Sequence, residues 1–116
     1  MSFTAQSIID RAKAKWKEST DGDMLSPANC LIAITDGLIA VRSARPECYQ
    51  DFYTGFLYEH VDVTDKDQVI YIQDRFREAL AAHLIMSGYS GDSDSQNHAE
   101  LSNEWSARFK KLVESA

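Results

Sequence analysis

The chain has 116 residues, 44% hydrophobic and 26% charged, which is typical of a single globular domain (1–116) and excludes a disordered chain. Its formal net charge of −6 argues against a free nucleic-acid binder, because phosphate contacts need clustered Lys and Arg. No apolar run approaches the roughly 20 residues of a membrane helix, and the N-terminus lacks the layout of a signal peptide. We therefore expect a protein made and kept in the cytoplasm, unless it leaves inside an assembled particle.

The first predicted helix covers residues 4–18. Ile8, Ala12 and Trp16 recur every four residues and form an apolar stripe, while three lysines fall mostly outside it. Thr4 is a suitable N-terminal cap. This pattern predicts a surface helix with one buried face.

The second predicted helix starts at Pro27, with Ser26 as its cap, and ends before Pro46. Its apolar residues cover more than one face: Leu31, Ile32, Ile34, Leu38, Ile39 and Val41. We expect such a helix either to be central to the core or to be buried on two sides, by its own core and by a neighbouring subunit.

After Cys48 the hydrophobic period changes from 3.6 to 2. Residues 52–60 alternate and are rich in aromatics, and residues 69–72 form a second short β-branched run. We predict a β-hairpin or an extended arm here. So apolar an arm should not face water alone, and we expect these residues to contact an adjacent subunit: Phe52, Tyr53, Phe56, Leu57 and Tyr58.

Two more helices are predicted, over residues 74–89 and from a possible capping box at Ser93 and Gln96 to about residue 114. The predicted fold class is mainly α, a four-helix bundle with a β-hairpin or extended arm between the second and third helices. Its predicted core is Leu31, Ile34, Leu38, Leu80, Leu84, Trp105 and Phe109.

No catalytic, metal or cofactor site is predicted, and we expect no enzyme. The three histidines share no metal-ligand spacing: His60, His83 and His98. His83 lies on an apolar helical face and fits a core histidine better than a ligand. Cys30 and Cys48 form no CxxC motif, and Cys30 fits a small core residue rather than a cytosolic disulfide.

Three closely spaced acids could suggest a calcium loop: Asp62, Asp65 and Asp67. The central glycine and the final glutamate of that pattern are absent, so solvated turn acids are the better interpretation. Residues 19–72 as a whole carry nine acidic residues against three basic ones. This acidic middle could repel DNA or attract a basic partner, or it could simply be a solvated surface.

Short motifs follow one another in a set order: Thr4-Ala5-Gln6 before Ile8-Ile9-Asp10-Arg11, Asp21-Gly22 before Leu25-Ser26, Thr35-Asp36-Gly37, Arg45-Pro46, Ala79-Leu80 before Gly88-Tyr89-Ser90, and Asn97 and Ala99 before Phe109. In this order the chain resembles the adaptor, or head–tail connector, proteins of tailed bacteriophages. It departs from them at Met24, where a Trp is common, and at Thr35, where an Asn is usual; Cys30 and Ala33 also stand in a stretch that is usually more polar.

The resemblance implies a structural virion protein without catalytic residues or cofactors. Such subunits form a ring of about twelve copies in the phage neck, beneath the portal protein and above a tail or stopper protein. They complete the head after DNA packaging, and the DNA passes through without specific binding.

The expected portal contact is the basic segment Phe109, Lys110, Lys111 and Leu112. The expected channel-facing acids are Asp62, Asp65 and Asp67. The alternative is a small helical protein-interaction module, such as a regulator or an accessory subunit, which would be monomeric or dimeric at all concentrations.

Overall fold

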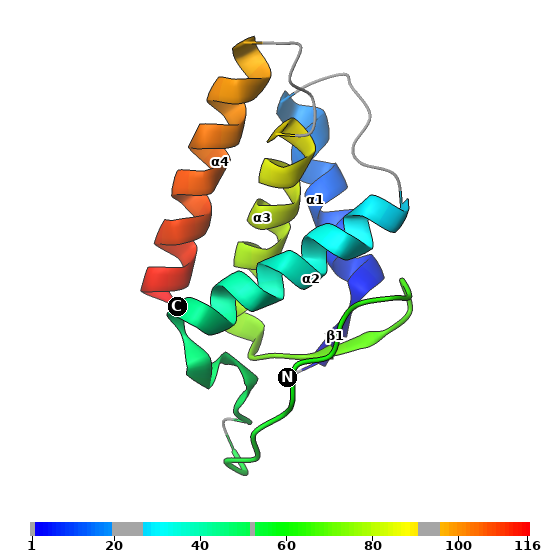
Figure 1. Cartoon of the computed structure of the whole chain (residues 1–116), viewed down its shortest axis with the longest axis vertical. Coiled ribbons are helices and arrows are strands. Elements are labelled where there is room, and N and C mark those ends of the chain that lie inside the picture. Colours follow the sequence, from blue (N-terminus) through cyan, green and yellow to red (C-terminus); the bar gives the residue numbers. More distant parts are fainter. Residues whose placement is uncertain (1, 20–26, 52, 91–95) are drawn as a thin grey trace.

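The computed structural model describes residues 2–19, 27–51, 53–90 and 96–116. These residues form, in chain order, β1 (Ser2–Thr4), α1 (Ala5–Ser19), α2 (Pro27–Ala44), the short 3-10 helix η1 (Pro46–Tyr49), β2 (Val69–Tyr71), the 3-10 helix η2 (Asp74–Phe76), α3 (Arg77–Ser90) and α4 (Gln96–Ser115). The predicted class, mainly α with four helices, is confirmed. Figure 1 shows α1, α3 and α4 running along the long axis, α2 crossing them, and the segment between α2 and α3 extending from one end.

Helix α1 begins where the sequence predicts, because its first amides find acceptors. The backbone N–H of Ser7 donates to Oγ1 of Thr4 at 3.3 Å, as expected of an N-terminal cap. The amides of Ala5 and Gln6 donate to the carbonyls of Gln68 and Lys66 at 3.1 and 2.8 Å. The start of the chain is therefore tied to the segment that leads into β2.

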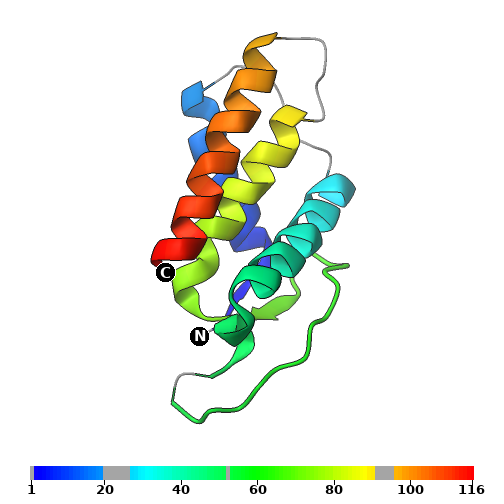
Figure 2. The same cartoon turned by 60° about the vertical axis from the view of Figure 1, so that its left-hand side comes forward.

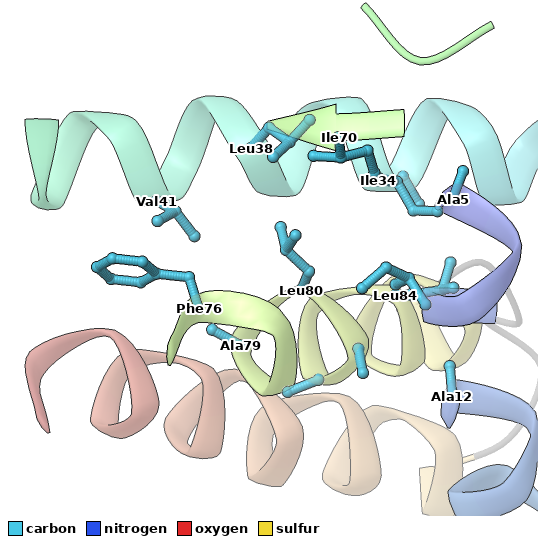
Figure 3. Packing of buried hydrophobic residues seen from close by; sticks show 14 of the residues in the cluster. Ala5, Ala12, Ile34, Leu38, Val41, Ile70, Phe76, Ala79, Leu80 and Leu84 are labelled. Atoms are coloured by element: carbon cyan, nitrogen blue, oxygen red, sulfur yellow. The ribbon is translucent and has the colours of Figure 1, made fainter. Parts of the chain in front are cut away.

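Helix α3 is the centre of the molecule, in contact with the three other helices. Its residues from Ala79 to Ile85 are all buried, which is typical of a helix surrounded by protein. Ile34, Leu38 and Val41 of α2 face Leu80 and Leu84 of α3 across the core (Figure 3).

The predicted core is confirmed for Ile34, Leu38, Leu80, Leu84 and Trp105, which are buried. Leu31 and Phe109 are only half-buried and pack at the edge of the core. Cys30 and Cys48 are buried and not bonded to each other, and Cys30 is a core residue as predicted. Burial raises the pKa of both thiols, that of Cys48 to about 11.

Gly37 sets the close approach of α2 to α3. A Cβ at this position would lie 3.2 Å from Cγ and from Nδ1 of His83. The imidazole is buried as predicted and meets the ring of Phe109 edge-on, with centroids 5.1 Å apart. Burial lowers the pKa of His83, although the Asp36 carboxylate opposes this effect. The Nδ1 atom of His83 has no hydrogen-bond partner in the described structure.

The segment between α2 and α3 takes the extended form of the two that were predicted. The run at 69–72 does form a strand, β2, but β2 pairs antiparallel with β1, with Phe3 opposite Ile70. The earlier aromatic run contributes a single bridge between Gln50 and Leu57. β2 therefore pairs with the N-terminus of the chain and not with the aromatic run.

Some sequence expectations lie outside the described residues. These are the turn at Asp21-Gly22, the Ser26 cap, the Ser93 capping residue and the Phe52 contact. The Trp16 side chain also lies outside the described part.

Candidate interaction surface

Residues 50–68, which we call the arm, leave the helices between η1 and β2 (Figure 2). A tight turn forms the tip. The carboxylate of Asp51 accepts hydrogen bonds from the backbone amides of Tyr53 and Thr54 at 2.8 and 3.0 Å. These bonds lower the pKa of Asp51. Gly55 follows with φ of +75°, a conformation that glycine adopts without strain.

A buried amide fastens the base of the arm. Gln73 is 8% exposed, and its Nε2 donates to the carbonyls of Glu47 and Gln50 at 3.0 and 2.9 Å. Its Oε1 accepts from Nε of Arg75 at 2.7 Å. Gln73 therefore links the start of the arm to the residues that follow β2.

A second anchor is a chain of three polar side chains. The hydroxyl of Tyr49, buried at the end of η1, lies 2.7 Å from Nδ1 of His60. Nε2 of His60 lies 2.9 Å from Oδ1 of Asp62. Because a carboxylate only accepts, His60 carries its proton on Nε2 when neutral and accepts from Tyr49. Burial raises the pKa of Tyr49, so its hydroxyl stays a donor.

Threonine and glutamine hold the returning half of the arm. The amide of Val63 donates to Oγ1 of Thr35 in α2 at 2.9 Å, and Val63 itself is buried. The side chain of Gln68 accepts a hydrogen bond from the amide of Thr64 at 3.0 Å and donates one to the carbonyl of Asp62 at 2.9 Å. Within Thr35-Asp36-Gly37, Thr35 therefore bonds to the arm, and Gly37 leaves room for His83 of α3 to pack closely.

The held arm nevertheless exposes large apolar side chains. The exposed fractions are 91% for Tyr53, 64% for Leu57, 63% for Val61 and 59% for Phe56. Tyr58, which is also expected at the interface, is half-buried, and its ring stacks on that of Tyr71 with the centroids 4.9 Å apart. We call Tyr53, Phe56, Leu57 and Val61 the arm surface.

Helix α2 also carries unburied apolar residues. Ile32 and Ile39 are 59% and 47% exposed, on the side of α2 away from the core. The sequence placed both on a widened apolar face, and the described part of the chain covers neither. Among the described residues, α2 is therefore buried on one side, and its second apolar side is exposed.

The two charged sets predicted from the sequence differ in exposure. The acids Asp62, Asp65 and Asp67 are all exposed on the returning half of the arm. On α4, Lys110 and Lys111 are exposed, but Phe109 and Leu112 pack against the core. Within the expected portal contact, Lys110 and Lys111 are therefore more exposed than Phe109 and Leu112.

Sequence reasoning missed the residues that hold the arm: Thr35, Tyr49, Gln73 and His60. A glutamine directly after a β-branched run was the available signal, but its acceptors lie 23 and 26 residues away. It also missed Val61, Val69 and Tyr71 as exposed apolar residues.

In the described ranges, no group of three or more His, Cys, Asp or Glu residues is arranged to hold a metal ion. None of the described helices has both the length and the apolar character needed to cross a membrane. The accessible features of this site are the apolar arm surface and the exposed acids Asp62, Asp65 and Asp67, which suit contact with another macromolecule. Comparison with known proteins gives no match among family models, curated proteins or solved structures.

Proposed function

We propose that this chain is a structural adaptor subunit of a tailed-phage neck, forming a ring beneath the portal and joining the head to the tail. The observation that carries the proposal is an apolar arm surface on a firmly anchored arm. An isolated loop with such aromatic exposure would be an aggregation liability, whereas a subunit interface covers it. The kind of assembly that we propose comes from the resemblance of the motif order to that of phage adaptor proteins.

The arm surface and the outer face of α2 supply two different apolar patches. Contacts between identical subunits in a ring are head-to-tail, so two distinct patches are what such a ring needs. In this arrangement the arm of one subunit packs on Ile32 and Ile39 of the next.

Charge supports the same arrangement. The arm carries five carboxylates against Lys66, a net charge of −4. A basic surface on a neighbouring molecule would complement this charge. The acids Asp62, Asp65 and Asp67 would then line the channel and repel the passing DNA, and Lys110 and Lys111 would meet the portal.

The test uses Tyr53→Ser with Leu57→Ser, and Lys110→Ser with Lys111→Ser, in particles that otherwise contain every neck protein. Ala14→Ser with Ala107→Ser is the matched control, since both alanines are exposed outside these surfaces. Surface substitutions of this kind change stability by about 0.5 kcal/mol or less. We expect the first two variants to fold and to lose occupancy of the neck in electron micrographs, and the control to keep it.

Normal occupancy by all variants would show that these surfaces are assigned wrongly. Absence of the wild-type protein from the neck, together with a monomer or dimer at every concentration, would instead support the regulator or accessory subunit.

A further inference from the structure

A groove lies between the arm, β2 and α2. Its volume is about 710 Å³, within the roughly 300–1,000 Å³ of typical ligand sites. Leu38, Tyr49 and Ile70 line its buried side, and Val61, Val69 and Tyr71 line its exposed walls. The groove is thus mainly apolar and open along one strand of the sheet.

One edge of β2 has free backbone groups along this groove. The amide of Ala5 bonds to the carbonyl of Gln68, which makes these two residues a hydrogen-bonded pair of the antiparallel ladder. Such pairs alternate, so Ile70 bonds to Phe3, and the N–H and C=O of Val69 and Tyr71 point to the opposite edge. Among the described residues, no hydrogen bond reaches these groups of Val69 and Tyr71.

The charge of the groove indicates what could occupy it. Glu59 and Asp62 line it, and its lining contains no Lys or Arg among the described residues. An extended segment with alternating basic and apolar residues would match both the carboxylates and the apolar floor. The arm of a second copy would bring the same −4 charge and is disfavoured by repulsion.

We propose that β2 binds an extended segment of another protein, with alternating basic and apolar residues, as an added strand in this groove. Val69 and Tyr71 supply the main-chain hydrogen bonds, and side chains of one face of the added strand enter the groove. The basic side chains, on the other face of the added strand, approach the exposed carboxylates Glu59 and Asp62. The inference rests on the edge and the groove and not on the proposed ring.

A capped seven-residue peptide alternating lysine and valine is the probe, measured by fluorescence anisotropy on the full chain. One control peptide replaces every lysine by glutamate. Another keeps the sequence but carries backbone N-methyl groups on the lysine residues, because their amides face β2 when the valine side chains point into the groove. This removes the strand-forming donors without changing charge. We expect binding of the lysine peptide, about tenfold or greater loss with N-methylation, and no binding of the glutamate peptide.

The protein variant is Val69→Pro, because proline is tolerated at an edge strand when the lost N–H faces outward. Val69→Thr keeps the donor and is its matched control. We expect Val69→Pro to weaken the lysine peptide about tenfold and Val69→Thr to bind as wild type. Bound peptide should also slow hydrogen exchange at the Val69 and Tyr71 amides of the wild-type protein.

Equal binding of the N-methylated peptide would overturn the proposal, because it would show charge adsorption alone. Exchange protection elsewhere in the chain without protection at the Val69 and Tyr71 amides would also overturn it. Self-association that Val69→Pro abolishes would assign the edge to a second copy instead. The peptide controls remain decisive if Val69→Pro fails to fold.

Discussion

Replacing Gln73 by Ala tests whether one buried amide holds the arm to the helices. The substitution removes the Nε2 donor from the carbonyls of Glu47 and Gln50. The Glu47 carbonyl keeps a bond from the amide of Gln50 at 3.0 Å, so it loses one of two partners. The Gln50 carbonyl keeps none among the described residues.

The two losses have different sizes. A lost bond costs about 0.5–1.5 kcal/mol, and a polar group left without a partner costs about 1–3 kcal/mol. We therefore expect Gln73→Ala to lower the free energy of unfolding by about 2–4 kcal/mol. Faster hydrogen exchange at the amides of Gln50 and Tyr58 should accompany this loss, since both belong to the arm and its base.

Urea denaturation measures the free energy, and Gln6→Ala is the control. Gln6 also donates from Nε2, to Asp10 at 2.8 Å, but this bond is exposed and should contribute little. If Gln73→Ala lowers the free energy of unfolding by less than about 0.5 kcal/mol, as little as the control, Gln73 does not hold the arm to the helices.

Four further predictions follow from the core, the buried groups and the charge. Trp105→Ala should lower stability by about 3–5 kcal/mol in urea denaturation, because the indole is 6% exposed. The lowered pKa of His83 means that the unfolded chain binds its proton more readily. Stability should therefore fall as pH drops below about 6.5, and His83→Leu should flatten this dependence in melting curves at successive pH values. Cys30 and Cys48 should react with a disulfide reagent at neutral pH only after unfolding, which absorbance can follow. The isolated protein should not bind duplex DNA at about 0.15 M salt in a gel-shift assay; binding that weakens steeply with added salt would contradict the proposed channel role.

Much of the helical fold could be predicted from the sequence, because helix signals are local. Pro27 and the Arg45-Pro46 stop gave the limits of α2 to within one residue. Thr4 marked the start of α1 through its own hydroxyl. Most of the residues that the apolar spacing placed in the core are buried, since a period of 3.6 puts those side chains on one face whatever they pack against.

The position and anchoring of the arm could not be predicted in the same way. An alternating run predicts a strand but does not name its partner, and β2 pairs with β1 about 67 residues earlier in the chain. The arm surface was recognised from composition, yet Tyr58 proved half-buried because Tyr71 stacks on it. Val61 was missed because its exposure depends on where Thr35 and Gln68 hold the chain.

The sequence by itself determined the helices, their inner faces and the acidic, aromatic character of the arm. The reason is that propensity, capping and periodicity act over a few neighbouring residues. The tertiary structure decided the clamp of Gln73, the Tyr49–His60–Asp62 chain and the open edge of β2. The Gln73 bonds and the Tyr49–His60 bond join residues 11 to 26 positions apart, and the sheet pairs two regions about 67 positions apart. No local pattern encodes such distances.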